Sequence, residues 1–484
     1  MTQHQEDEKQ SLSPSIWMSD DHSERNLQKQ PQTSSSRNST TGMTRAKTTT
    51  NTSDTASREE QSSVVLRAPF FGGLDFERSW ERRWQTLAMF TCSLYFILPS
   101  IMAAWTLTLW CLLFGYRIMV VGPWLTVATA AYLGYAFVLD DSPTTRRRSP
   151  ILRWLLRGWM EHACDYLPLL LVKTADLPVS TNTGREADND TEDEGQRYIL
   201  GYHPHGIISV GCYLSFATDG ARVLDLTTDK TGMDNNEDER HEEQQSRKGR
   251  GFSSLFPGLD RRVVSLPQNL QTPFIREYFL SLGVVSSSKE SFRNVLSSKG
   301  QSHNANNNVA LILVVGGAAE SLCTAEGYMD LIVEKRKGFC REAILSRASL
   351  VPVLGFGEND LYHVMQPGSY MARIQAVVKK WTGYGMPLFH GRSILLRDVG
   401  IMPQRKPVVV VVGAPLPPPK WNNEKEFLPE MDRRTGRALN KDGQTLNDYH
   451  AQYVSALQDL YETYKDATWN VPGRNRRGPM KIVK

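Results

Sequence analysis

The stretch Gln196-Arg-Tyr-Ile-Leu-Gly-Tyr-His-Pro-His-Gly206 joins a short apolar run to two histidines that flank a proline. An apolar run that ends at a Pro and a Gly is typical of a buried β-strand, so Tyr198 to Tyr202 is predicted to be one. The histidines then stand at the carboxyl end of that strand. Three roles are open for them: metal ligands, a general base, or packing.

Further apolar runs lie downstream and alternate with helix-like stretches: Arg262–Leu266, Val309–Val315, Leu350–Phe356 and Pro407–Gly413. Such runs, bounded by Gly or Pro, are typical of strands covered on both faces. They predict one α/β domain with a largely parallel sheet over residues 150–470. Polar insertions, predicted to be loops or disordered, interrupt this domain at 185–196, 227–251 and 422–445. A stripe with helical spacing, which we expect to pack in the core, follows: Tyr453, Leu457, Leu460, Tyr461 and Tyr464.

A second cluster, Gly316-Gly-Ala-Ala-Glu-Ser-Leu322, follows the run Val309–Val315. In open α/β sheets ligands bind outside the carboxyl ends of the strands, so this cluster should lie near the histidines. Glu320 is then placed to orient an imidazole and to stabilise its charged form. Gly206, Gly316 and Gly317 are expected to allow tight turns and to present N–H groups to a developing oxyanion.

The two histidines are not equivalent. Pro204 favours an extended backbone at His203, whereas His205 precedes Gly206, where the chain can turn into a helix. We expect His205 to be the general base and His203 to shape the site, with the opposite assignment open. No third His or Cys has the spacing of a metal ligand, so no metal is expected. A purely structural role for both histidines is the remaining alternative.

A basic cluster stands before a predicted helix: Lys335, Arg336, Lys337 and Arg341. Cations near a helix start suit phosphate groups such as those of coenzyme A. Solvated surface charge is the alternative interpretation.

Several function classes lack their signatures. The sequence has no serine-hydrolase elbow, P-loop, dinucleotide-binding glycine motif or zinc-protease motif. A net charge of +4 is too small to indicate nucleic-acid binding, and no motif for it is present. The six cysteines form no CxxC pair, which is typical of a reducing compartment.

The N-terminal part indicates a membrane. Residues 1–62 are polar and are predicted to be a disordered tail. From Leu87 to Leu139 the only charge is Arg117, and this length accommodates two spans of about 20 residues each. Arginines flank the run on both sides, so 81–149 is predicted to form a membrane-embedded helical hairpin with both ends in the cytosol. A buried helical hairpin of a soluble core is the alternative.

Two further segments have membrane-surface character. Trp154–Val172 is amphipathic, a pattern shared by interfacial segments and by ordinary core helices, here one ending at Pro168. The basic tail at 471–484 suits anionic lipid headgroups.

Together these residues resemble the type-2 diacylglycerol acyltransferase family, which includes monoacylglycerol and wax alcohol acyltransferases. The similarity runs from about Glu81 to Trp469. Its most specific motifs are Gly201-Tyr-His-Pro-His-Gly-Ile207, Phe256-Pro-Gly258, Arg276-Glu-Tyr278, Gly316-Gly-Ala-Ala-Glu320, Arg336-Lys-Gly-Phe339, Leu350-Val-Pro-Val353 and Phe356-Gly-Glu-Asn-Asp360.

The resemblance implies a glycerolipid-acyltransferase-like α/β domain facing the cytosol from the endoplasmic reticulum membrane, with lipid droplets as a second location. The implied reaction is acyl transfer from acyl-CoA to the free hydroxyl of 1,2-diacylglycerol, with no cofactor. Expected partners are acyl-CoA, diacylglycerol, the lipid bilayer and, in a homo-oligomer, a second copy of the chain. The alternatives are a monoacylglycerol or wax-alcohol acyltransferase and, in a different class, a non-catalytic lipid-binding scaffold on lipid droplets.

Overall fold

The apolar runs form one eight-stranded sheet in the computed structural model. The structure describes residues 79–95, 98–114, 122–140, 150–179, 195–227, 249–297, 308–365, 373, 377, 388–394, 399–419, 442–469 and 480–483. The strand order is β3-β1-β11-β8-β2-β6-β4-β5. The strands are β1 Leu169–Lys173, β2 Arg197–His203, β3 Arg222–Asp225, β4 Asp260–Ser265, β5 Val284–Ser286, β6 Val309–Val314, β8 Ser349–Phe356 and β11 Val408–Val412. All five strands predicted from the sequence are present.

Strand direction divides the sheet into two parts. β8, β2, β6, β4 and β5 run parallel to one another. β11 pairs with β8 antiparallel, and β1 and β3 follow the direction of β11. The largely parallel sheet is thus confirmed, apart from the β11–β8 pair. The carboxyl ends of β8, β2, β6, β4 and β5 consequently share one edge.

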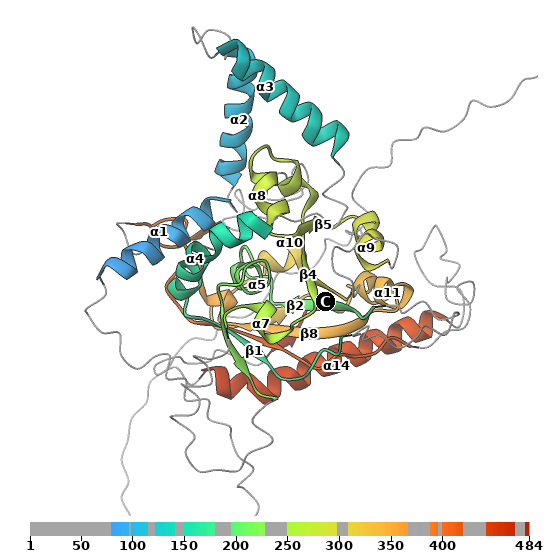
Figure 1. Ribbon diagram of the computed structural model, residues 1–484. Helices are drawn as coiled ribbons and strands as arrows, with labels where there is room; N and C mark the ends of the chain where they lie inside the picture. The colour runs from blue at the N-terminus through green and yellow to red at the C-terminus, as the bar shows by residue number, and fades with distance from the viewer. Residues whose placement is uncertain are drawn as a thin grey trace, which may run out of the picture. The chain divides into compact units, whose positions relative to one another are not determined.

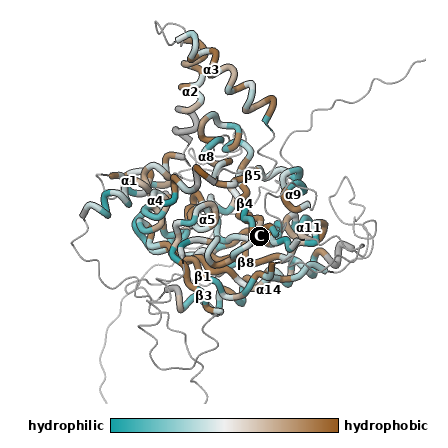
Figure 2. The backbone as a smooth tube through the Cα atoms, in the orientation of Figure 1, coloured by the Kyte–Doolittle hydropathy of each residue, from teal (hydrophilic) through white to brown (hydrophobic). Residues whose placement is uncertain are grey.

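Helices cover both faces of the sheet (Figure 1). One apolar core packs under α4 Pro150–Tyr166, α5 Val210–Phe216, α7 Phe252–Leu255 and α8 Ile275–Ser281, which follows the 3-10 turn η5 Pro267–Gln271. The other packs under α9 Lys289–Leu296, α11 Gly338–Leu345 and α14 Asp442–Trp469. The strands between these layers are coloured largely hydrophobic in Figure 2. Their sequences are continuously apolar because both faces of the sheet are covered.

Short elements complete the described part. Two turns at the sheet edge are α10 Gly317–Ser321 and η6 Glu358–Asp360. β9 His363–Met365 pairs antiparallel with β10 Leu388–His390, and β7 Asp330–Leu331 pairs parallel with β12 Lys481–Ile482. β12 lies within the segment predicted as a basic tail, and α14 begins inside the predicted insertion 422–445 and contains the predicted helical stripe. The tail at 1–62 and most of the three insertions lie outside the described residues.

The N-terminal helices differ in part from the predicted hairpin. α2 Leu98–Phe114 and α3 Gly122–Gly134 lie side by side, and the Thr126 hydroxyl donates to the carbonyl of Cys111 over 3.1 Å. α3 continues as η2 Tyr135–Leu139. Within the described residues, Gly122–Leu139 is the one helical stretch long and apolar enough to cross a membrane, and the apolar part of α2 is shorter. A hairpin that spans twice stays a prediction.

The beginning of the predicted membrane run belongs instead to the domain. α1 Ser79–Tyr95 packs on α4, where Trp84 meets Trp159 edge-on and the Trp159 indole donates to Thr91 over 2.8 Å. Met89 is buried in the same core as the sheet. One face of α1 therefore packs on the domain, while Leu87 and Leu94 on the same helix stay partly exposed. The periodicity of an apolar face cannot tell a lipid contact from a helix contact.

α3 is also tied to the domain. The buried Arg276 of α8 pairs with Asp140, directly after η2, and with Glu277 at 2.6 Å. Tyr132 stacks on Phe274, with ring centroids 5.4 Å apart.

The docking of α1 makes a stability prediction. We expect Met89→Ala to lower the free energy of unfolding by about 2–5 kcal/mol, because it leaves a cavity against α4. Leu94→Ala, on the more exposed side of the same helix, should cost less than about 1 kcal/mol. Thermal unfolding of the detergent-purified chain measures both. Equal losses would contradict the packing of α1.

Candidate active site

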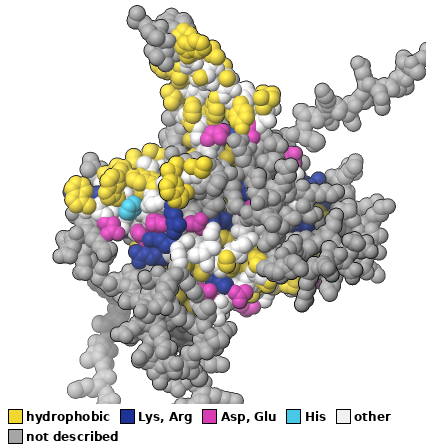
Figure 3. Space-filling view, in the orientation of Figure 1, with side chains coloured by type: hydrophobic (Ala, Val, Ile, Leu, Met, Phe, Trp, Pro, Cys, Tyr) yellow, Lys and Arg dark blue, Asp and Glu magenta, His cyan; other side chains and the backbone are white. Residues whose placement is uncertain are grey.

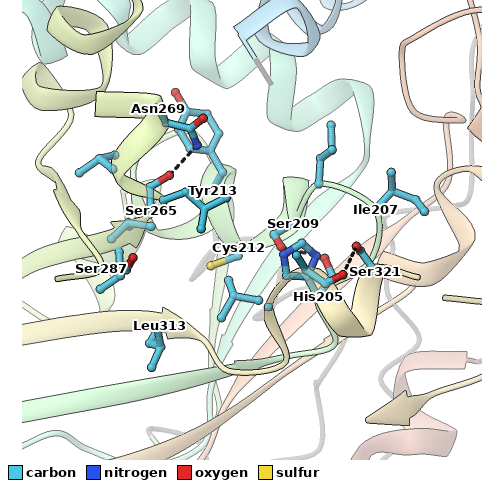
Figure 4. Close-up of a pocket in the computed structure, with 18 of the residues that line it drawn as sticks. His205, Ile207, Ser209, Cys212, Tyr213, Ser265, Asn269, Ser287, Leu313 and Ser321 are labelled. Atoms are coloured by element: carbon cyan, nitrogen blue, oxygen red, sulfur yellow. Dashed lines mark hydrogen bonds between the residues drawn. The ribbon is translucent and has the colours of Figure 1, made fainter. Parts of the chain in front are cut away.

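A cavity of about 220 Å³ lies at the carboxyl edge of the parallel strands (Figure 4). Residues that follow β2, β4, β5 and β6 contribute to its wall. Just over half of the lining side chains are hydrocarbon: Ile207, Ile208, Val263, Val264, Leu266, Phe279, Val284, Leu313, Val314, Ala318 and Phe389. The polar ones include His205, Ser209, Ser265, Asn269, Ser287 and Ser321. The space therefore suits an apolar chain with a few fixed polar contacts.

His205 is the titratable imidazole in this wall. Its Nδ1 lies 3.1 Å from the carbonyl of Gly206, an acceptor that is satisfied when Nδ1 carries the hydrogen. Nε2 then holds the lone pair that a general base needs. Burial lowers the pKa of His205 below the ordinary 6.5, because a charged imidazolium is poorly solvated there. The ring is accordingly neutral near pH 7.

Glu320 meets His205 through the backbone, not through the ring. One carboxylate oxygen accepts the amide N–H of His205 at 2.5 Å, and the other accepts the N–H of Ile332 at 2.8 Å. The side chain is buried, and burial raises its pKa to about 7 while the two amides and Arg336 act to lower it. The expected pair comes together, but Glu320 holds the loop that presents the imidazole. The sequence predicted that Glu320 orients the imidazole ring directly, but the carboxylate contacts the His205 backbone instead.

His203 lies outside the cavity wall and is fully buried. Its Nε2 is 3.1 Å from the Tyr453 hydroxyl, which also lies 3.1 Å from the carbonyl of Gly201. Burial lowers the pKa of His203 to about 3, so it stays neutral. The imidazole in the cavity wall is that of His205; its assignment as general base stays a prediction.

Close contacts leave no room for a side chain at two of the three predicted glycines, Gly206 and Gly316. Gly206 has φ +61°, and a Cβ there would meet the Glu358 side chain at 2.8 Å. A Cβ on Gly316 would overlap the folded-back carboxylate of Glu320. Gly317 lies on the cavity wall with φ +58°.

Comparisons with known proteins identify the family to which the chain belongs. The family model described as Diacylglycerol acyltransferase matches residues 118–230 and 244–475. The chain belongs to the diacylglycerol acyltransferase family. "Diacylglycerol O-acyltransferase 2A" of Umbelopsis ramanniana is 33% identical over 340 residues, covering 69% of this chain and 76% of that one. "Diacylglycerol O-acyltransferase 2" of Dictyostelium discoideum is 32% identical, covering 74% and 88%.

Two other matches add context for this family member. "2-acylglycerol O-acyltransferase 1" of Bos taurus is 32% identical over 66% of this chain and 75% of that one. The crystal structure of a 1-acyl-sn-glycerophosphate acyltransferase from Thermotoga maritima covers 76% of this chain and 98% of its own, with a TM-score of 0.29 and 12% identity. The α/β fold is defined by the strand order and strand directions of this chain, independently of that crystal structure.

The basic cluster of this diacylglycerol acyltransferase lies apart from the cavity wall. Lys337 Nζ donates to Asn447 of α14 at 2.5 Å, and Arg341 lies 3.8 Å from Glu342. Arg336 is close enough to act on the Glu320 carboxylate, and Lys335 is exposed beside it. Among the described residues no group of three or more His, Cys, Asp or Glu is placed to hold a metal ion.

Two residues near the site had no predicted role in it, although Tyr453 was expected to pack in the core. Glu358, inside the motif Phe356-Gly-Glu-Asn-Asp360, accepts the Tyr202 hydroxyl at 2.8 Å and the Gly211 N–H at 2.9 Å. It anchors the start of α5 beside His205. Its position directly after a predicted strand was a usable signal. Tyr453 offered none, because its role depends on α14 packing back onto β2.

Glu358 makes stability depend on pH. Burial raises its pKa to about 7, so native protein keeps a proton that the unfolded chain loses near 4.5. Stability from this group is complete below pH 4.5 and is lost as pH rises through 7. The difference in unfolding free energy between wild type and Glu358→Gln should therefore fall by about 3 kcal/mol over that window.

Thermal unfolding at several pH values, with both proteins in the same detergent, measures this difference. Glu334→Gln changes an exposed glutamate and serves as the matched control, with a curve parallel to wild type. A parallel curve for Glu358→Gln as well would contradict the raised pKa.

Proposed function

We propose that this chain transfers a fatty acyl group from acyl-CoA to the free hydroxyl of 1,2-diacylglycerol, giving triacylglycerol and coenzyme A. The observation that supports this most directly is a neutral imidazole, His205, in the wall of a largely hydrocarbon cavity. Membership of the diacylglycerol acyltransferase family, and the activity that gives the two relatives above their names, fit the same reaction.

The proposed chemistry is general-base acyl transfer. His205 Nε2 takes the proton of the acceptor hydroxyl as its oxygen attacks the thioester carbonyl. The resulting tetrahedral oxyanion collapses, the carbon–sulfur bond breaks, and the imidazolium returns the proton to the leaving thiolate. Backbone N–H groups near Gly316 and Gly317 are proposed to stabilise the oxyanion. These steps require no cofactor.

Glu320 supports this chemistry by position. Its two hydrogen bonds fix the backbone of His205 relative to Ile332, so the imidazole reaches the cavity in one orientation. Lys335, Arg336, Lys337 and Arg341 are proposed to bind the phosphates of coenzyme A, outside the reacting cavity.

The proposed location is the endoplasmic reticulum membrane and the surface of lipid droplets, with the domain in the cytosol. Large apolar side chains are exposed on α1 and α4, including Trp80, Ile151 and Trp154 at about 70% each. Figure 3 shows these hydrophobic side chains gathered over α1 and α4, with basic side chains next to them. An apolar face beside arginines suits a lipid headgroup boundary.

The reaction is tested by expressing the chain in yeast that lacks its own neutral-lipid acyltransferases. We expect labelled acyl-CoA and diacylglycerol to give triacylglycerol in microsomes, and His205→Ala to lower the rate by at least about 100-fold. Tyr453→Phe, which removes only the hydroxyl next to His203, should keep most of the rate.

Other outcomes discriminate the alternatives. Monoacylglycerol is the second acceptor to supply to the microsomes, because the chain is also similar to a bovine 2-acylglycerol acyltransferase. If product formed only from monoacylglycerol, or only from a long-chain alcohol, that compound would be the acceptor in place of diacylglycerol. No product from any acceptor would favour a lipid-binding scaffold. A larger loss from Tyr453→Phe than from His205→Ala would make His203 the base.

Topology is tested separately, with an epitope tag at each end of the printed sequence. Protease added to sealed microsomes should remove both tags, because a hairpin returns the chain to its starting side. A lumenal marker protein must stay intact as the control. Protection of one tag would mean that the chain crosses the membrane an odd number of times.

A further inference from the structure

The cavity has a second polar end, formed by Ser265 and Ser287. Ser265 is the last residue of β4, and Ser287 follows β5. The N–H of Ser287 donates to the carbonyl of Ser265 over 2.9 Å, so strand pairing holds the two residues next to each other. In Figure 4 they lie with Asn269 on one side of the cavity, and His205 lies on the other, with Cys212 between them.

The hydrogen bonding at this end leaves donors for a ligand. The Asn269 side-chain amide donates to the Ser265 oxygen over 2.9 Å. A hydroxyl that accepts in this way still has its own hydrogen to donate. Ser287 brings a second hydroxyl to the same wall. A carbonyl oxygen, with two lone pairs, is the group that two such donors fit.

Charge defines the class of ligand further. Among the described residues that line the cavity there is no Lys, Arg, Asp or Glu. A phosphate or carboxylate would find no counter-charge there, and its desolvation would be uncompensated. An ester or amide carbonyl is neutral and needs only hydrogen-bond donors. The surrounding wall, with Val264, Leu266 and Val284, suits the hydrocarbon attached to such a group.

We propose that Ser265 and Ser287 bind a neutral carbonyl of the substrate while its reacting end lies at His205. This inference rests on the proposed acyl transfer and adds the substrate group that is recognised. Two substrates contain such a carbonyl: the ester groups of diacylglycerol and the amides of the pantetheine arm of acyl-CoA. The contact fixes the substrate at two points along the edge of the sheet, which is how a small number of polar groups sets orientation in an apolar cavity.

The test uses the full-length chain in mixed micelles with the double variant Ser265→Ala/Ser287→Ala. We expect the apparent KM for 1,2-diacylglycerol to rise about tenfold, because two neutral hydrogen bonds are lost. The loss should appear in KM rather than in kcat. The ether analogue 1,2-dialkylglycerol, which has no ester carbonyl, should show the same KM with wild type and variant.

Measuring the KM of diacylglycerol and the KM of acyl-CoA separately shows which substrate supplies the carbonyl. A rise in the KM of acyl-CoA with no change for diacylglycerol would also support the subsite, with the pantetheine amide as its ligand. Ser281→Ala is the matched control, since this buried serine of α8 donates to Tyr278 and does not line the cavity. It should leave both KM values as in wild type.

Two results would overturn the subsite. Unchanged KM values for both substrates in the double variant would mean that no carbonyl is bound there. An equal rise for the diacyl and dialkyl acceptors would mean that the serines only support the fold. Both results require an active wild-type enzyme, so failure of the proposed reaction itself, seen as no triacylglycerol from wild type, stays distinguishable.

Discussion

The carboxylate of Glu320 is the contact on which the geometry of the site depends. It lies in α10, the short turn after β6, is buried, and accepts one amide from the loop after β2 and one from the segment before α11. A buried carboxylate is costly unless its oxygens are satisfied, and here two backbone donors satisfy them. The loop that carries His205 is thereby tied to a region more than 100 residues away, at the point where His205 enters the cavity.

Glu358 repeats this arrangement on the neighbouring side. It is also a buried acid directly after a parallel strand, and it binds Tyr202 and the first turn of α5. Burial raises the pKa of both acids to about 7. The loop that carries His205 thus contacts two buried acids, and the neutral state of the imidazole follows from burial in the same apolar surroundings.

The sequence was sufficient for the elements whose signals are local. Strands such as Val309–Val314 are continuously apolar because both of their faces are covered, and the turn residues after them place His205 and Glu320 at one edge. The partners of a side chain are not local. Whether Glu320 would meet the ring or the backbone of His205, and whether Tyr453 would reach His203, depended on packing between segments over 100 residues apart. The packing of α1 on α4 depended on such non-local contacts as well.

The antiparallel β11–β8 pair has a consequence for where the chain tolerates extra length. Because β1, β3 and β11 run opposite to β2, their carboxyl ends share an edge with the amino ends of β2 and β6. The three polar insertions, at 185–196, 227–251 and 422–445, follow β1, β3 and β11 and so all join the sheet at that edge. The reacting groups are at the opposite edge. Length added to these connections therefore meets the sheet away from the cavity and from His205.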